Sequence, residues 1–246
     1  MKIILTIAGS DPSAGAGVQQ DLKTITAMGA YGATVITALT SQNTMGVQGV
    51  MPVPADVVES QLRSVLDDLD VSAIKIGMIP DINVARVITN ILREYNGDGT
   101  IPVVIDPVML STSGTRLMSE DCIDYVRKEL FPLCTLVTPN MPEAELLPPP
   151  YPTAFLIKGG HADGQEMTDT LYCKDNSVHT FTSKRIDSTN LHGTGCTLSS
   201  AIATALAQGK SLPEAVHCGK DMINKGIEKG RHLRIGKGNG PLWLNS

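Results

Sequence analysis

The 246-residue sequence lacks the features that define membrane-spanning and nucleic-acid-binding proteins. It has no apolar run that approaches the roughly 18 residues needed to cross a bilayer. Asp and Glu (25) outnumber Lys and Arg (20), and the net charge of -5 leaves no basic surplus to neutralise phosphates. Aromatic residues make up only 4% and do not flank a Lys/Arg cluster. We therefore expect neither a membrane nor a nucleic acid as partner.

Metal-binding and disulfide patterns are also absent. The five cysteines are odd in number, widely spaced and never form a C-x-x-C pair, which excludes a disulfide framework or a zinc site of that kind. The five histidines show no H-x-H or H-x-x-x-H spacing. Any metal ion is therefore expected to be held by carboxylates.

The first residues, "MKIILTIAGSDPSAG", contain a short apolar run that breaks after Ala8. This run is typical of a strand rather than of a signal peptide, so we expect a cytoplasmic protein. The composition, with 42% apolar and 18% charged residues, is ordinary for a soluble globular chain. Neither a linker nor a repeat interrupts it, and we expect residues 1–246 to form a single domain.

Strand-like runs alternate with helical patterns along the chain. The predicted strands are residues 2–9, 32–39, 72–77, 101–107, 134–139 and 153–160. Several are apolar on both faces, which predicts a mainly parallel sheet covered by helices on both sides, a three-layer α/β/α fold. Residues 170–174 and 178–183 predict an edge hairpin, and residues 196–208 and 212–229 predict two final helices.

Glycine and polar residues collect where these strands end, and parallel sheets bind ligands beyond the carboxyl ends of their strands. The segments are residues 9–17, 40–44, 77–81, 106–114, 138–145 and 158–164. The first segment matches neither the Walker nor the Rossmann fingerprint, so its glycines are read as tight-turn residues. Gln42, at the second strand end, is either part of a capped loop or an amide donor and acceptor for a heterocycle.

Oxygen and nitrogen side chains at the later strand ends indicate a phosphate and magnesium site. Asp106, Asn140 and Glu143 supply the few oxygens that Mg²⁺ requires beside waters and phosphates. The alternative is that Asn140 and Glu143 simply cap a helix. Lys158 ends an apolar strand beside two glycines, which favours a phosphate contact.

The stretch "HGTGCTLSSAIATALAQG" passes from a glycine turn into a helix. Gly193, Thr194, Gly195 and Cys196 present successive backbone N–H groups at a helix N-terminus, where anions are stabilised. The same field is expected to lower the pKa of the Cys196 thiol, so we expect a catalytic thiolate. The alternative is a small buried cysteine at a helix start.

Together these motifs closely resemble the hydroxymethylpyrimidine/phosphomethylpyrimidine kinases of thiamin biosynthesis, which belong to the ribokinase-like superfamily. The resemblance covers nearly the whole chain. It is carried by "IAGSDPSAGAGVQQDLK", "TALTSQNT", "IKIGMI", "VVIDPVMLSTSGTRL", "TPNMPEAELL", "IKGGH", "HGTGCTLSSAIA" and "GKGNGPL". The G-T-G-C turn is the most specific, because sugar kinases of the superfamily carry aspartate in place of the cysteine.

This resemblance implies two successive phosphoryl transfers from Mg-ATP to 4-amino-5-hydroxymethyl-2-methylpyrimidine, and a homodimer as the usual assembly. The implied contacts with the pyrimidine are Asp21, Gln42, Met78 and Val108. The implied contacts with the nucleotide are Lys158, Thr194 and Asn140, and Asp106 and Glu143 would serve the magnesium ion. Cys196 would be the general base beside the anion hole of residues 193–196.

Three other functions compatible with the sequence are a pyridoxal or pyridoxine kinase on the same fold, a non-catalytic nucleotide or pyrimidine sensor, and a thiol-dependent hydrolase. The hydrolase has the weakest case, because only His192 lies near Cys196 in the sequence. The chain departs from the family after Leu147, where a helix-bearing stretch is expected before the next strand. Either a crossover helix is lost or a segment is missing from the sequence; its shortness favours the second.

Overall fold

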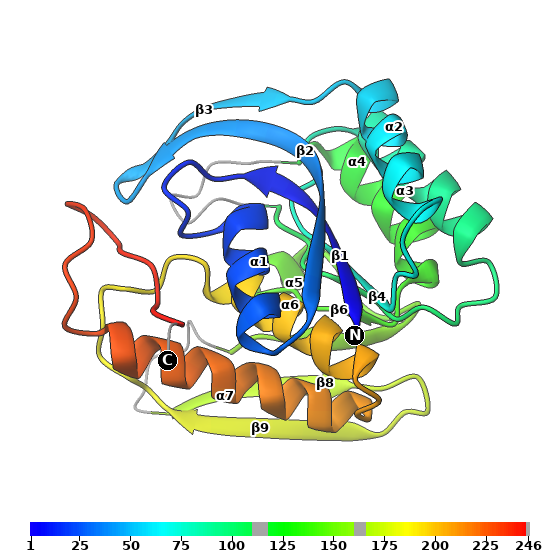
Figure 1. Cartoon of the computed structure of the whole chain (residues 1–246). Helices are drawn as coiled ribbons and strands as arrows, with labels where there is room; N and C mark the ends of the chain where they lie inside the picture. Colours follow the sequence, from blue (N-terminus) through cyan, green and yellow to red (C-terminus); the bar gives the residue numbers. More distant parts are fainter. Residues whose placement is uncertain (110–117, 160–165, 245–246) are drawn as a thin grey trace.

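The predicted α/β architecture is confirmed in the computed structural model, which describes residues 1–109, 118–159 and 166–244 (Figure 1). Within these ranges the strands form one sheet in the order β3-β2-β1-β4-β5-β6-β7-β8-β9. The strands are β1 (Ile3–Ser10), β2 (Tyr31–Asn43), β3 (Gly46–Pro52), β4 (Ala73–Ile76), β5 (Val103–Ile105), β6 (Leu136–Val137), β7 (Ala154–Ile157), β8 (Glu166–Tyr172) and β9 (Val178–Lys184).

The middle of the sheet, from β2 to β7, is parallel, and β3, β8 and β9 add antiparallel edges. β4 and β5 are buried along their whole length, because both sheet faces are covered. The edge hairpin β8–β9 is confirmed. The parallel direction brings the ends of β1, β4, β5, β6 and β7 to the same edge of the sheet.

Helices cover both faces of the sheet, as Figure 1 shows. The helices are α1 (Gly17–Ala27), α2 (Ala55–Leu66), α3 (Ile82–Tyr95), α4 (Glu120–Tyr125), α5 (Met141–Glu145), α6 (Thr194–Ala207) and α7 (Leu212–Gly230), and two single turns, η1 (Val126–Leu130) and η2 (Phe131–Leu133), follow α4. One apolar core lies under α2, α3 and α4, and a second lies under α1, α6 and α7. None of the helices in the described ranges is long and apolar enough to cross a membrane.

The hairpin β2–β3 was not predicted from the sequence. The sequence pattern places residues 40–44 at the end of a strand, but β2 continues through Asn43 and then pairs with β3 in the antiparallel direction. A register shift between Ser41 and Gln42 interrupts this pairing. Two glycines, Gly46 and Gly49, and few apolar residues hide the β3 pattern, because side-chain periodicity is the main strand signal.

The parallel pair β6–β7 forms although the chain is short after Leu147. Leu136 pairs with Ala154 and Val137 with Phe155, and residues 138–153 make the connection with α5 as its helix. Leu147 is buried against the first core. Residues 138–153 therefore make a parallel connection with α5 as its short helix. The expectation that a segment is missing from the sequence after Leu147 stays a prediction.

Helix α6 runs through the centre of its layer, against α1, α7 and strands β1, β4 and β5. Ten of its residues are buried, and most of them are alanine, serine or threonine, whose small side chains permit close packing on the sheet. The helix begins at Thr194, two residues before the predicted start. Its N-terminus therefore lies at the edge where the parallel strands end.

A buried ion pair connects α1 to the middle of the sheet. Lys75 Nζ on β4 lies 2.7 Å from Asp21 Oδ2 on α1, and both side chains are 0% exposed. The hydroxyls of Thr6 and Ser200 donate to the same carboxylate at 2.6 and 2.8 Å. The Asp21 carboxylate thus accepts three hydrogen bonds, and such additional bonds offset the cost of burying a charged pair.

We predict that Lys75→Met lowers the free energy of unfolding by about 3–5 kcal/mol, because it leaves the Asp21 carboxylate buried without its counter-ion. Arg63→Met is the matched control. Arg63 pairs with Glu94 at 2.9 Å on the exposed surface, where ion pairs contribute little. Urea denaturation of both variants measures the difference, and an equal loss for the two would contradict the prediction.

Candidate active site

The N-terminus of α6 lies against the ends of β5 and β7. A Cβ placed on Gly195 would lie 2.8 Å from Asp106 Oδ2 and 3.6 Å from Lys158 Nζ, so the helix backbone approaches both side chains closely. The backbones of Lys158 and Asn140 form an isolated parallel β-bridge just beyond β6 and β7. The predicted phosphate-site residues are therefore brought together. Residues 110–114 and 160–164 of the predicted strand-end segments lie outside the described residues.

Lys158 and Asp106 form the central ion pair of this site. Lys158 Nζ lies 2.7 Å from Asp106 Oδ1, and the two side chains are 17% and 6% exposed. Although burial opposes the charge, Asp106 and Glu143 hold the pKa of Lys158 above its ordinary value. The ammonium is therefore charged at any physiological pH and is placed to bind an anion that enters beside α6.

Asn140 and Glu143 form a reciprocal cap on α5. The Asn140 side chain accepts the Glu143 N–H at 2.9 Å, and the Glu143 carboxylate accepts the Asn140 N–H at 2.9 Å. The second oxygen of Glu143 accepts the Met109 N–H at 3.2 Å. The capping alternative considered for these two residues is thus confirmed. Burial, partly offset by Lys158, raises the pKa of Glu143 to about 7.

Cys196 lies in the first turn of α6, after the left-handed Gly193 (φ 86°). Burial raises the pKa of its thiol to about 11, although Lys75 and the backbone N–H of Gly17 act in the opposite direction. The expected depressed pKa is therefore wrong: burial outweighs the charge of Lys75 and the Gly17 N–H. The thiol is neutral at physiological pH.

Asp21 has no atom open to a ligand in this structure. Its side chain is fully buried, and its two oxygens already accept bonds from Thr6, Lys75 and Ser200. The predicted direct contact between Asp21 and a pyrimidine is not available in this conformation. Asp21 instead neutralises the buried ammonium of Lys75.

The other three residues predicted to contact a substrate are half-buried and follow different strands. Gln42 lies at the end of β2, Met78 follows β4 and Val108 follows β5. The Met78 carbonyl accepts the Thr37 hydroxyl at 2.7 Å, and the Val108 N–H donates to the Asp106 carbonyl at 2.9 Å. These bonds fix the two backbones, so their side chains have defined positions.

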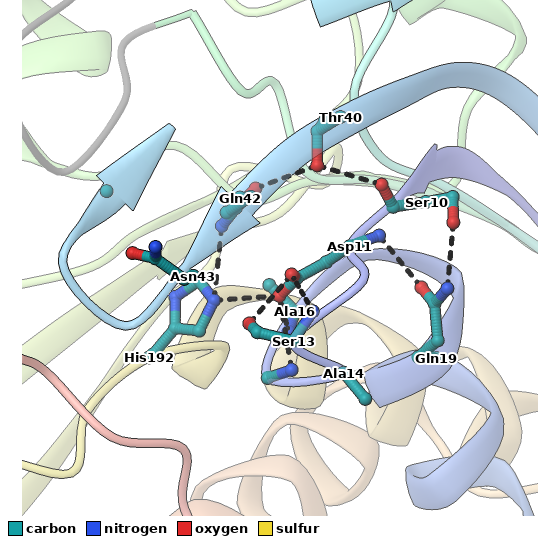
Figure 2. A network of polar contacts seen from close by, with 12 residues as sticks. Ser10, Asp11, Ser13, Ala14, Ala16, Gln19, Thr40, Gln42, Asn43 and His192 are labelled. Atoms are coloured by element: carbon teal, nitrogen blue, oxygen red, sulfur yellow. Dashed lines mark hydrogen bonds and ion pairs between the residues drawn. The ribbon is translucent and has the colours of Figure 1, made fainter. Parts of the chain in front are cut away.

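Three residues of the site were not singled out from the sequence as functional: Asp11, Lys75 and His192 as a partner of Asp11. Figure 2 shows Asp11 accepting bonds from the turn that follows β1 and lying beside His192, which also approaches Gln42. The "SDPSAG" stretch is typical of an aspartate that binds its own turn, and could have identified Asp11. The contact with a residue 181 positions away has no local signal.

Asp106 is the residue that best fits a magnesium ion. Lys158 occupies its Oδ1, whereas its Oδ2 faces the start of α6. Glu143 fits less well than predicted, because both of its oxygens accept backbone N–H groups. No three His, Cys, Asp or Glu side chains gather as a metal site in the described part of the chain. One carboxylate is nonetheless consistent with Mg²⁺, which is often held mainly by waters and phosphates.

The sheet topology, the central helix and this site define a kinase of the ribokinase-like fold. The family model for phosphomethylpyrimidine kinase matches residues 11–151 and 148–243, and the chain belongs to that family. The two matched pieces meet at residues 148–151, where the sequence departs from the family pattern.

Relatives of known name support this assignment. The hydroxymethylpyrimidine/phosphomethylpyrimidine kinase of Rhizobium meliloti is 43% identical over 259 aligned positions, which cover 98% of this chain and 96% of that one. The Escherichia coli protein of the same name is 39% identical and covers 97% and 95%. The crystal structure of phosphomethylpyrimidine kinase from Clostridium difficile 630 has a TM-score of 0.78 at 38% identity, and covers 92% and 100%. Pyridoxal kinase from Staphylococcus aureus in complex with ADP has a TM-score of 0.87 at 31% identity, and covers 98% and 93%.

We predict that Gly195→Ala lowers kcat/KM by about 100-fold, because its Cβ would push α6 away from Asp106 and misplace the reacting groups. Gly49→Ala is the control, since a Cβ there meets nothing closer than 3.8 Å. Kinase assays and thermal melts of both variants test this. A Gly195→Ala enzyme with wild-type kcat/KM would contradict the close approach.

The raised pKa of Glu143 predicts a pH-dependent stability. Because its folded pKa of about 7 exceeds the ordinary 4.5, the residue stabilises the fold below about pH 4.5, and this contribution is lost as pH rises through about 7. Glu143→Gln should remove that loss, on the order of 2–3 kcal/mol. Urea denaturation between about pH 5 and 8 tests this against Glu145→Gln, an exposed residue of the same helix. Parallel curves for wild type and Glu143→Gln would contradict it.

Proposed function

We propose that the protein phosphorylates 4-amino-5-hydroxymethyl-2-methylpyrimidine with ATP, and then phosphorylates the monophosphate to the diphosphate, in thiamin biosynthesis. The observation that carries this proposal is the contact of Lys158 and Asp106 with the N-terminus of α6 at the strand ends. A cation beside the N-terminal backbone N–H groups of a helix supports phosphate binding, although the Thr194 N–H also donates to the Leu191 carbonyl at 3.3 Å. The names of the relatives supply the substrate.

The phosphate side of the reaction uses the charged part of the site. Lys158 would bind the nucleotide phosphates, the backbone N–H groups of residues 193–196 would bind the transferred phosphoryl group, and Thr194 would add its hydroxyl. Asn140 would shape the nucleotide side through its cap on α5. Asp106 would hold magnesium, which supplies neutralisation of phosphate charge when bound.

The substrate side uses the half-buried residues that follow β2, β4 and β5. Gln42 would hydrogen-bond the heterocycle, and Met78 and Val108 would pack against it. The pyrimidine hydroxymethyl group would then face the start of α6. In the first step its oxygen forms a bond to the γ-phosphorus as the bond to ADP breaks, and the hydroxyl proton passes to Cys196.

The neutral thiol of Cys196 limits this proton transfer, because only the thiolate can accept the proton. The rate of the first step is therefore expected to rise with pH over the physiological range. The second step has no such requirement, since the attacking oxygen belongs to a phosphate that is already ionised.

We predict that Cys196→Ala lowers the rate of the first phosphorylation by at least about tenfold more than that of the second, and removes the rise of the first rate with pH. Cys218→Ala, a half-buried cysteine of α7, is the control and should change neither rate. Single-turnover assays with each substrate measure the two rates. Equal loss of both rates in Cys196→Ala would show that the thiol is not the base.

Pyridoxal kinase is the second candidate, because the Staphylococcus aureus pyridoxal kinase has the higher TM-score, 0.87 against 0.78. Overall shape does not separate two kinases that share a fold, whereas side chains set substrate choice. The pyrimidine kinases have the higher identity, which favours the first candidate. Measured kcat/KM values for the aminopyrimidine and for pyridoxal test the choice, and a higher value for pyridoxal would overturn it.

We also propose that the protein acts in the cytoplasm as a homodimer. Support for the dimer comes from exposed apolar side chains on the hairpin β2–β3, which are Leu39, Met45, Val47, Val50 and Met51. Such a cluster on one sheet edge is typical of a protein–protein contact.

A further inference from the structure

His192 connects three parts of the site, as Figure 2 shows. Its Nε2 lies 2.9 Å from Asp11 Oδ2 in the turn after β1 and 3.2 Å from the Gln42 side-chain nitrogen at the end of β2. The His192 side chain is 15% exposed and that of Asp11 is 3% exposed. His192 directly precedes Gly193, the first residue of the proposed anion hole.

The ionisation state of the Asp11 carboxyl decides which ring nitrogen of His192 carries hydrogen. Burial opposes ionisation, but hydrogen bonds from His192, Ser13 and Ala16 together bring the pKa of Asp11 down to about 2. The carboxylate is therefore ionised and can only accept hydrogen bonds. Nε2 of His192 must donate to it, because a lone pair at 2.9 Å from the carboxylate would be repelled.

A donating Nε2 determines the orientation of the Gln42 amide. If the Gln42 amide nitrogen faced His192, its N–H donor would point at the Nε2–H donor. The two ends of an amide have the same shape, so hydrogen bonds decide between the two orientations. Thr40 donates its only hydroxyl hydrogen to the Ser10 carbonyl at 2.9 Å, and so can accept from Gln42 but not donate to it. With the Gln42 oxygen toward His192 and its nitrogen toward Thr40, no two donors face each other. The single Nε2 hydrogen is then shared between the Asp11 carboxylate and the Gln42 oxygen, and the Thr40 hydroxyl oxygen accepts from the Gln42 nitrogen.

The imidazole is held in place from several sides. A Cβ on Gly15 would lie 2.3 Å from its Cδ2, so the ring packs directly on the first turn. The backbone N–H of His192 donates to the Gly240 carbonyl at 3.1 Å in the C-terminal segment, which fixes the main chain that carries the ring. The ring therefore cannot turn away from Asp11 and Gln42 without displacing its neighbours.

We infer that the Asp11–His192 pair is a positioning device that fixes the Gln42 amide and makes the site select an amino-substituted over an oxo-substituted pyrimidine. An aminopyrimidine edge presents a ring-nitrogen acceptor beside an amino donor, whereas its 4-oxo analogue presents a ring N–H donor beside a carbonyl acceptor. An amide that is free to turn by 180° can pair with either edge. An amide fixed by Thr40 and His192 keeps one free N–H and one free lone pair in a single order, and so pairs with one edge.

This inference rests on the proposed function, and its test is the ratio of kcat/KM for the aminopyrimidine to that for the 4-oxo analogue. His192→Phe keeps an aromatic ring but removes the donor, and should lower the ratio about tenfold. The loss should come through KM for the pyrimidine, with kcat for the aminopyrimidine changed less than about twofold. His192→Gln, which keeps an N–H donor, should recover part of the ratio.

A double-mutant cycle distinguishes orientation of Gln42 from an independent effect. Gln42→Ala should lower the ratio as His192→Phe does, and the double variant should show no further loss. An unchanged ratio in His192→Phe, or additive losses in the double variant, would overturn the inference while leaving the proposed function intact. A wild-type enzyme that does not phosphorylate the aminopyrimidine would overturn both.

A measurement on the unaltered protein covers the case in which the variants fail to fold. Nitrogen-15 NMR of the histidine side chains reports which ring nitrogen carries hydrogen. We expect His192 to carry hydrogen on Nε2. A resonance pattern showing hydrogen on Nδ1 alone would remove the donor to Asp11 and overturn the inference.

Discussion

The close approach of α6 to the ends of the central strands is the constraint on which the site depends. Only glycine fits at Gly193, where a Cβ would lie 1.9 Å from the Gly15 carbonyl oxygen, and at Gly195 a Cβ would crowd the Asp106 carboxylate at 2.8 Å. The small side chains along α6 extend this approach into the core. Because the helix is fixed so near to β5 and β7, its terminal N–H groups and Lys158 share one space, and two separate sources of positive potential act on the same anion.

Charge is arranged in two layers around this contact. Beneath the site, Lys75 and Asp21 are fully buried and neutralise each other. At its surface, Lys158 and Asp106 remain slightly exposed, so an entering anion can compete for the ammonium. The lower pair keeps a positive group near Cys196, but burial still dominates and the thiol stays protonated. Proton acceptance is therefore the weakest element of the site, whereas positioning and charge, the main requirements of phosphoryl transfer, are strong.

The sequence was informative where a residue's environment follows from its neighbours. Apolar strands and glycine-rich strand ends predicted the parallel sheet and the edge that carries Asp106, Lys158 and α6. Prediction from the sequence failed where a residue's environment is formed by segments that are distant in the chain. The burial that raises the pKa of Cys196 comes from other elements, and the approach of His192 to Asp11 spans 181 positions. The strand β3 was missed because it is stabilised by pairing with β2 rather than by its own composition.

Both phosphorylations are assigned to the one site at the N-terminus of α6. Phosphorus NMR of a reaction that contains the protein, Mg²⁺, ATP and the hydroxymethylpyrimidine tests it most directly, because it distinguishes a monophosphate from a diphosphate ester. We expect the monophosphate resonance to appear first and then to be replaced by the two coupled resonances of the diphosphate ester. Consumption of ATP with no phosphorus resonance from a pyrimidine ester would contradict it.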